Sequence, residues 1–155
     1  MNDPIRIAVL SDSHGLLRRE VVDQLADCTH ILHAGDVLRR SDLDELSLYG
    51  RLYAVRGNCD FTAAHPDRLV IHLGGLKIYL THGHIHRVKS GLDYLLSAAR
   101  EAGADVALYG HTHRANVEYT TPWLINPGAA EKDCCALLEI EKGKPHVKLI
   151  NLGFN

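Results

Sequence analysis

Short apolar runs alternate with polar or glycine-containing segments in the first third of the chain. The runs that predict strands are Ile5–Leu10, His30–Ala34 and Arg51–Val55. Between them, leucine and valine recur at helical spacing over about residues 17–26. A Ser-x-x-Asp capping pattern at Ser41 predicts the start of a second, short helix. Strands that alternate with helices in this order predict a parallel sheet with crossover helices.

The rest of the chain is richer in predicted strands. Arg68–Leu73 and Leu76–Leu80 flank two glycines, which is typical of a β-hairpin. A second Ser-x-x-Asp pattern predicts a helix from Ser90 to about Glu101, which Gly103 would end. Further short strands are expected at Val106–Tyr109, Ala115–Thr120, Trp123–Ile125, Cys135–Ile140 and Val147–Asn151. The whole pattern predicts an α/β fold, with two sheets packed face to face and helices outside, as one domain over residues 1–155.

Composition and charge exclude several classes of protein. The 155 residues are 46% hydrophobic and 23% charged with a net charge of -2, so no broad nucleic-acid-binding or anionic membrane surface is expected. No apolar run approaches the roughly 18 residues of a membrane span, and the first residues lack signal-peptide features. The four cysteines form no Cys-x-x-Cys pattern. We therefore expect a cytoplasmic protein that acts on a small substrate; its oligomeric state stays open.

Histidine is unusually frequent, with eleven residues, and two closely spaced pairs end apolar runs. These are His82-Gly-His84 and His111-Thr-His113. Imidazole is the commonest metal ligand of proteins. Side chains alternate in an extended chain, so each pair would point both rings to one side. The pairs predict a metal site built from loops that follow strands.

Three more polar clusters follow predicted strands: Asp12 with His14, Asp36, and Asn58 with Asp60. Each alone is explained as well by a turn or a helix cap. Sites in α/β sheets form outside the carboxyl ends of the strands, so all five clusters would meet at one rim. Their carboxylate, amide and imidazole ligands suit manganese, iron, zinc or nickel. They exceed the needs of one tetrahedral ion, so two divalent ions are expected, an arrangement used for displacement at phosphorus.

The order Asp-x-His, Gly-Asp, Gly-Asn, His-Gly-His, Gly-His-x-His resembles the calcineurin-like metallophosphoesterase superfamily. Gly57-Asn-Cys-Asp60, Thr81-His-Gly-His84 and Ile125-Asn-Pro-Gly128 resemble its small YfcE-type phosphodiesterase branch. The resemblance implies a four-layer α/β/β/α sandwich of two mixed sheets flanked by helices, with a dinuclear metal centre. It implies that one metal is held by Asp12, His14 and His113, the other by Asn58, His82 and His111, and that Asp36 bridges them. Manganese is the first expectation for both ions.

The resemblance also implies a metal-dependent phosphoesterase that favours phosphodiesters. A metal-bridging hydroxide would attack phosphorus, and Asn58 would stabilise the developing charge. Many members carry a histidine after the asparagine that helps to protonate the leaving group, but here the position is Cys59. His84 and Asp60 are the alternative proton donors, and His84 could instead only hydrogen-bond to a metal ligand. The alternatives are a phosphomonoesterase or protein phosphatase with the same centre, and a non-catalytic binding scaffold on the same fold.

Overall fold

The computed structural model describes residues 4–61 and 64–153 and contains two mixed sheets of five strands each. The first sheet has the order β10-β9-β1-β2-β3, and the second has the order β4-β5-β6-β8-β7. The strands are β1 (Ile5–Leu10), β2 (His30–His33), β3 (Arg51–Ala54), β4 (Arg68–Leu73), β5 (Leu76–Thr81), β6 (Val106–Leu108), β7 (Asn116–Glu118), β8 (Trp123–Asn126), β9 (Cys134–Glu141) and β10 (Lys144–Asn151). As predicted, β1, β2 and β3 are parallel, and β4 and β5 form an antiparallel hairpin.

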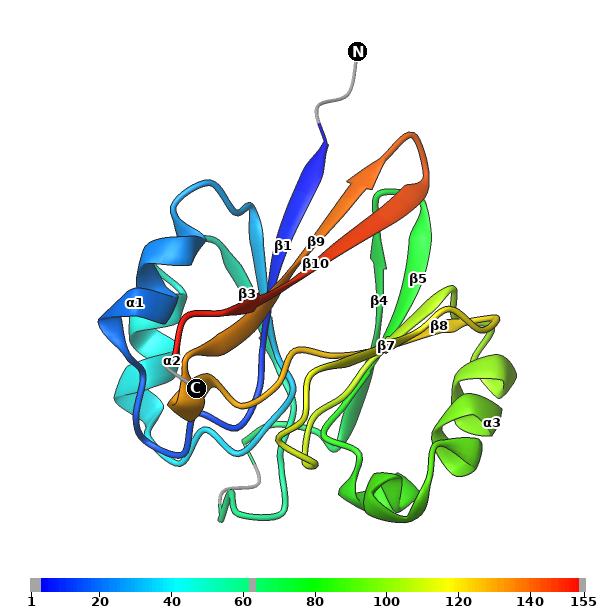
Figure 1. The fold of residues 1–155 in the computed structure, drawn as a ribbon, viewed down its shortest axis with the longest axis horizontal. Coiled ribbons are helices and arrows are strands. Elements are labelled where there is room, and N and C mark those ends of the chain that lie inside the picture. The colour runs from blue at the N-terminus through cyan, green and yellow to red at the C-terminus, as the bar shows by residue number, and fades with distance from the viewer. Residues whose placement is uncertain (1–3, 62–63, 154–155) are drawn as a thin grey trace.

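Helices cover the outer faces of the two sheets (Figure 1). On the first sheet lie α1 (Arg19–Val22), which a 3₁₀ turn at Asp23–Leu25 extends, and α2 (Arg40–Leu46). The second sheet carries α3 (Asp93–Glu101). This arrangement confirms the predicted α/β/β/α sandwich. Within the described residues, no helix has the length and apolar character that crossing a membrane would require.

Both predicted capping boxes are wrong. Helix α2 begins at Arg40 with Arg39 as its N-cap, so Ser41 lies inside the helix, and no side chain caps it. Helix α3 begins at Asp93, because Ser90 instead closes a 3₁₀ turn with its N–H on the carbonyl of Arg87. The observed N-caps, Arg39 and Leu92, lie two residues from the predicted serines, so neither serine hydroxyl is positioned to cap the first turn.

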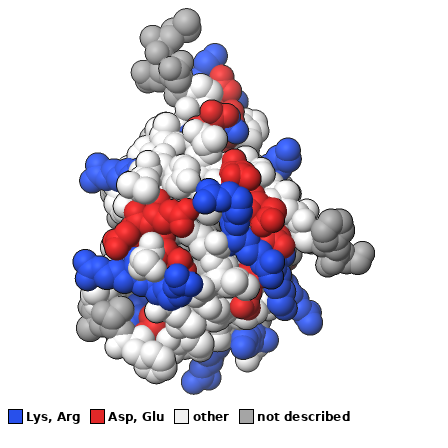
Figure 2. All heavy atoms as spheres, turned by 90° about the vertical axis from the view of Figure 1, so that its left-hand side faces the viewer, with Lys and Arg blue, Asp and Glu red and all other residues white. Residues whose placement is uncertain are grey.

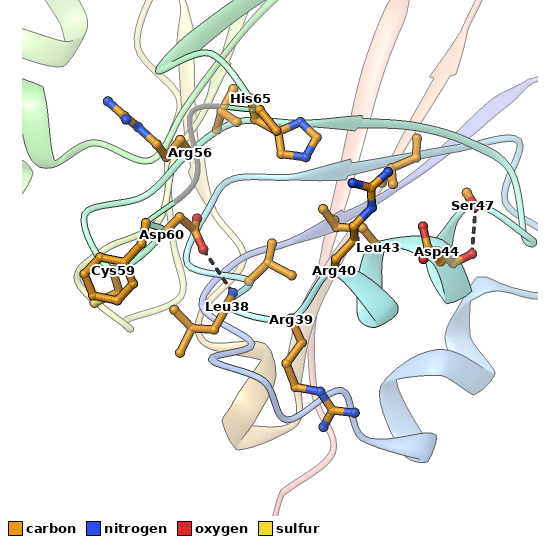
Figure 3. Close-up of a pocket in the computed structure, with 15 residues that line it drawn as sticks. Leu38, Arg39, Arg40, Leu43, Asp44, Ser47, Arg56, Cys59, Asp60 and His65 are labelled. Carbon is orange, nitrogen blue, oxygen red and sulfur yellow. Dashed lines mark hydrogen bonds between the residues drawn. The ribbon is translucent and has the colours of Figure 1, made fainter.

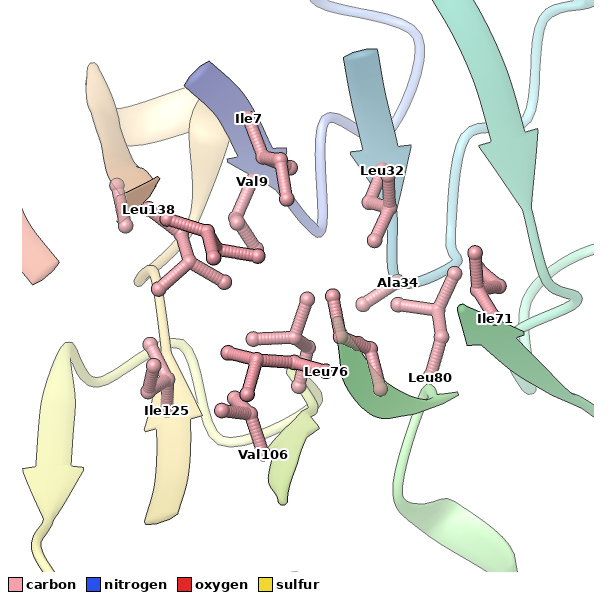
Figure 4. Close-up of a cluster of buried hydrophobic side chains, with 14 of the residues drawn as sticks. Ile7, Val9, Leu32, Ala34, Ile71, Leu76, Leu80, Val106, Ile125 and Leu138 are labelled. Carbon is pink, nitrogen blue, oxygen red and sulfur yellow. The ribbon is translucent and has the colours of Figure 1, made fainter. Parts of the chain in front are cut away.

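The main core fills the space between the sheets (Figure 4). Alternation along β1 explains how one strand serves two cores: Ile7 and Val9 face the other sheet, whereas Ala8 and Leu10 pack beneath the helices. Each such side chain, when fully buried, contributes about 1.5–3 kcal/mol of hydrophobic stabilisation. Hydrophobic packing therefore fixes the two sheets relative to each other, and with them the loops at one end of the sandwich.

The face covered by α1 and α2 carries charges of both signs side by side (Figure 2). Lysine and arginine side chains lie next to aspartate and glutamate side chains across this face. Opposite charges at such spacing largely cancel beyond a Debye length of about 8–10 Å. This face therefore offers no extended field of one sign to a charged partner.

Candidate metal centre

Six of the seven predicted metal ligands gather where four strands end. Asp12 and His14 follow β1, and Asp36 follows β2. His82 follows β5, and His111 and His113 follow β6. Two groups of three residues bring their ligand atoms within 4.8 Å of one another: Asp12, His14 and His113 form one, and Asp36, His82 and His111 form the other. The first group has the same members as one implied ligand set, and the second contains His82 and His111 of the other set with Asp36, the implied bridge, in place of Asn58.

Asp36 joins the two groups. Its Oδ2 lies 3.3 Å from His14 Nε2 and 3.2 Å from His82 Nε2. Its other oxygen, Oδ1, accepts a hydrogen bond from the Cys59 N–H at 2.8 Å. One carboxylate oxygen therefore faces imidazoles of both groups, and the other anchors the carboxylate to the neighbouring loop.

The backbone at this rim is left-handed rather than extended. Positive φ angles, between 48° and 71°, occur at Asp12, His14, Asp36, His111 and His113. Non-glycine residues in this region cost of order 1–3 kcal/mol each and cluster at functional sites. The expectation that each His-x-His pair is extended is wrong, because Gly83, His111 and His113 have positive φ angles, although the rings of His82 and His84 do lie close together. The strained turns separate the second pair, so that His111 joins one group and His113 the other.

A buried oxygen without a partner tests whether the site fits a cation. Asp12 is fully buried, and its Oδ2 accepts hydrogen bonds from the Ser11 hydroxyl and the His111 N–H. Its Oδ1 accepts none, yet it lies 3.2 Å from His113 Nε2. An unsatisfied buried acceptor costs about 1–3 kcal/mol. A divalent cation with oxygen and nitrogen ligands would offset that cost, so the residues present fit the implied metals.

A hydrogen bond sets which tautomer of the neutral His82 ring is present. His82 Nδ1 lies 2.8 Å from the carbonyl of Ala34, which can only accept, so Nδ1 carries the hydrogen and Nε2 keeps its lone pair. His111 Nδ1 lies 3.2 Å from His82 Nε2. Burial and the neighbouring His82 lower the pKa of His111 to about 4, which keeps that ring neutral. Metal-binding imidazoles must be neutral, so this ring is ready to bind.

The charges of the centre are strongly coupled. Burial alone would raise the pKa of Asp36, but the hydrogen bond and charge of His82, the Cys59 N–H and His14 outweigh it and hold the pKa well below its usual range. Burial would lower the pKa of His82, but Asp36 and Asp12 together raise it. Asp36 is therefore an anion between two groups of imidazoles, an environment that attracts cations.

Glu131 is a site residue that sequence reasoning missed. Its Oε1 lies 3.2 Å from Nδ1 of His14 and 3.7 Å from Nδ1 of His113. Its own N–H donates to the carbonyl of Asp12 at 3.2 Å, which holds it against the β1 loop. Carboxylates behind metal-binding histidines fix the ring orientation and raise ligand basicity. The only available signal was a carboxylate shortly after the Asn-Pro-Gly turn that ends β8.

The comparisons with known proteins agree with this geometry. The family model described as "Calcineurin-like phosphoesterase superfamily domain" matches residues 5–143. The chain belongs to the calcineurin-like phosphoesterase superfamily. Within it, the chain is 36% identical over 129 residues to "Probable metallophosphoesterase YsnB" of Bacillus subtilis, a match that covers 81% of this chain and 75% of the relative.

Two solved structures confirm the fold. The chain is similar to a predicted phosphoesterase from Streptococcus pneumoniae, with a TM-score of 0.82, 32% identity and coverage of 97% of this chain and 91% of the other. It is also similar to Vacuolar Protein Sorting 29 from Cryptosporidium parvum, with a TM-score of 0.80, 19% identity and coverage of 99% and 100%. The latter likeness concerns the fold alone.

The seventh predicted ligand, Asn58, is less closely tied to the centre. Its side chain is exposed, and its amide nitrogen lies 3.6 Å from Cys59 Sγ. It lies next to the loop anchored to Asp36, so its role as a ligand stays a prediction. Cys59 itself comes within 4.8 Å of the ligand atoms of His14 and Asp36.

Of the two proton donors expected from the sequence, only His84 remains free to act. The carboxylate of Asp60 accepts hydrogen bonds from the N–H groups of Asp36, Gly57 and Leu38 at 2.8, 2.9 and 3.0 Å, which joins two loops of the site. His84 lies beside the centre, with its ring 5.5 Å from that of His82, and its buried Nδ1 has no hydrogen-bond partner. Burial and the charge of His82 lower the pKa of His84.

Proposed function

We propose that this protein hydrolyses phosphate esters, with a preference for phosphodiesters, at a centre that holds two divalent metal ions. The observation that carries the proposal is the position of Asp36, one carboxylate within reach of imidazoles from two separate ligand groups. A bridging carboxylate of this kind is what a two-metal phosphoesterase requires. Membership of the superfamily supports the same reaction class.

In this proposal, different residues of the chain bind each of the two metal ions. Asp12, His14 and His113 would hold one ion, and His82 and His111, with Asn58, would hold the other. When bound, the two ions supply Lewis acidity for the phosphoryl group and for the attacking water, the hydroxide expected from the sequence. The mixed oxygen and nitrogen ligands favour manganese, with iron, zinc and nickel as alternatives.

His84 is proposed as the group that gives a proton to the leaving oxygen. Its half-buried ring lies beside His82, at 5.5 Å between ring centroids, which places it next to the ligand groups. Its lowered pKa means that the protonated ring is scarce at neutral pH. The donation therefore matters most for alcohols that leave poorly, because an acidic alcohol needs no proton to depart.

The preference for diesters is supported by the space beside the centre. An open cavity of about 1020 Å³ adjoins Cys59, which itself lies against the ligand groups. A phosphodiester carries two organic groups, and the cavity offers room for the one that does not leave. A phosphomonoester has only its leaving group to place, so a phosphomonoesterase is the second candidate.

The test compares a diester with a monoester that share one leaving group. Metal-free protein is reconstituted with manganese and assayed on bis(4-nitrophenyl) phosphate and 4-nitrophenyl phosphate. We expect a higher kcat/KM for the diester, and a loss of turnover of at least about 10²-fold in Asp36→Asn and in His111→Ala. Near wild-type turnover in both variants with metal still bound would refute the proposed centre, whereas faster monoester hydrolysis would refute only the preference.

The non-catalytic scaffold remains the alternative of another class. Such a protein would be expected to have lost metal ligands, yet all seven predicted positions retain side chains able to bind a metal. The fold of Vacuolar Protein Sorting 29 is shared at 19% identity, which says nothing about activity here. Absence of manganese binding by the reconstituted protein would favour this alternative.

A further inference from the structure

The cavity beside the metal centre has walls of distinct chemistry (Figure 3). One end is formed by Leu38, Cys59 and Asp60, and the other by residues of α2 that include Leu43 and Asp44. Its volume of about 1020 Å³ is at the upper end of the roughly 300–1,000 Å³ typical of small-molecule sites. The end at Cys59 lies next to the metal ligands, so a group in the cavity can stay attached to a phosphate at the centre.

Leu38 lines this end of the cavity and has an unfavourable left-handed backbone conformation. It lies two residues after Asp36, has a φ of 69°, and leaves 49% of its surface exposed. A large apolar residue at positive φ is uncommon and costly. The Leu38 N–H donates to Asp60, the carboxylate that also binds the Asp36 N–H, so the strained residue is anchored to the metal-site loops.

A second apolar side chain lines the same cavity. Phe61 is 99% exposed, the most exposed of the large hydrophobic residues of the described chain. An aromatic ring left fully in water beside a site is suited to stack on a planar ligand. Leu38 and Phe61 thus give the cavity two exposed apolar surfaces.

Three arginines that line the cavity indicate which class of ligand it can bind. Arg39 is engaged by the carbonyl of Gly15 at 3.0 Å, and Arg56 by Asp67 at 3.0 Å. Arg40 also lines the cavity, is exposed, and makes no ion pair in the part of the chain that the structure describes. Guanidinium groups can only donate hydrogen bonds, and a purely apolar ligand would offer them no acceptor. A planar heterocycle joined to a sugar offers them hydrogen-bond acceptors.

Building on the proposed phosphodiesterase function, we propose that the cavity binds the nucleoside part of a nucleoside phosphodiester. The base packs on Leu38 and Phe61, and Arg40 binds acceptors of the base or sugar. The phosphate lies at the metal centre on the far side of Cys59. Leu38 and Phe61 therefore determine specificity and take no part in the reaction itself.

The test uses two diesters with the same leaving group, thymidine 5′-(4-nitrophenyl phosphate) and methyl 4-nitrophenyl phosphate. We expect the wild type to have a KM for the thymidine ester about 10-fold below that for the methyl ester, since only the thymidine base can pack on both Leu38 and Phe61. Leu38→Ala and Phe61→Ala should each raise the thymidine KM about 3- to 10-fold more than the methyl KM, with kcat little changed. Because Phe61 is fully exposed, its replacement does not threaten folding.

Leu48→Ala is the matched control. Leu48 is 82% exposed and lies outside the cavity lining, so its removal should change neither KM. Binding of thymidine 5′-phosphate by calorimetry gives a readout that needs no hydrolysis. Hydrolysis of both esters with equal KM, unchanged in Leu38→Ala and Phe61→Ala, would overturn the nucleoside site and leave the phosphodiesterase standing. No hydrolysis of either ester, with nucleotide binding weakened by Leu38→Ala, would reject the phosphodiesterase and retain the cavity as a nucleotide site.

Discussion

At the scale of single residues, the centre depends on which group contacts Nδ1 of each imidazole. The Ala34 carbonyl fixes His82, whereas Glu131 faces Nδ1 of both His14 and His113. The two halves of the centre therefore differ, because among the described residues only one half has a carboxylate facing Nδ1 of its imidazoles. A carboxylate raises the basicity of the opposite ring nitrogen and hence the affinity for metal.

We expect Glu131→Gln to weaken one of two manganese-binding steps by about 10- to 100-fold and to leave the other nearly unchanged. Calorimetric titration of metal-free protein measures both steps. Glu139→Gln is the control, because Glu139 on β9 pairs only with Arg6, at 3.7 Å. Equal weakening of both steps, or no weakening, would contradict the assigned contact.

The role of His84 is separable from metal binding through the leaving group. We expect His84→Gln to slow hydrolysis of an alkyl phosphodiester by about 10²-fold or more, the size of a general-acid contribution. Hydrolysis of a 4-nitrophenyl diester should fall far less, because that alcohol leaves as an anion. Steady-state kcat values of wild type and variant are measured for both esters. An equal fall in kcat for the two esters would contradict proton donation and assign His84 an orienting role instead.

At the scale of elements, close contact between the loops after β1 and β6 assembles the centre. A Cβ on Gly110 would meet the Ser11 hydroxyl and, at 2.6 Å, Asp12 Oδ2. Only glycine allows this approach, which lets the His111 N–H reach Asp12. The two strands belong to different sheets, so this contact also links the halves of the sandwich.

Gly110→Ala should therefore lower the free energy of unfolding by about 1–3 kcal/mol, the usual cost of overpacking. It should also weaken manganese binding, because Asp12 is displaced. Urea unfolding and metal titration measure the two effects. Gly153→Ala, whose added Cβ would lie 3.2 Å from the Lys132 carbonyl, should cost less stability than Gly110→Ala and leave manganese binding unchanged.

The sequence predicted the strands and the ligand set better than it predicted local geometry. Apolar runs placed β1 within its observed bounds, and the ordered motifs placed the two ligand groups. Capping patterns failed at Ser41, which lies inside α2, and at Ser90, which belongs to a separate 3₁₀ turn before α3. Glu131 was missed because two of its partners, His14 and Asp12, lie more than a hundred residues away along the chain, and no spacing rule reports such contacts.

At the scale of the whole molecule, a buried histidine couples the site to folding. His33 is fully buried; its Nδ1 accepts from the Gly35 N–H, so its Nε2 donates to the Ser13 hydroxyl. Burial lowers its pKa to about 4 from an ordinary value of 6.5. Between these values the unfolded chain takes up a proton that the folded protein refuses, so stability falls as the pH falls.

This group alone should make the metal-free protein about 2 kcal/mol less stable at about pH 5 than at about pH 7.5, since each pKa unit is worth about 1.4 kcal/mol. His33→Gln can keep both hydrogen bonds and should reduce that difference. Urea unfolding at the two pH values measures it. An unchanged difference in the variant would show that other groups control the acid sensitivity.

The central claim is that two divalent ions share Asp36. Electron paramagnetic resonance of manganese-reconstituted protein, with metal content measured on the same sample, tests it most directly. The account predicts two manganese ions per chain with an exchange-coupled signal, and loss of the coupling in Asp36→Asn. A single equivalent of manganese, or two ions that give only isolated-ion signals, would contradict it.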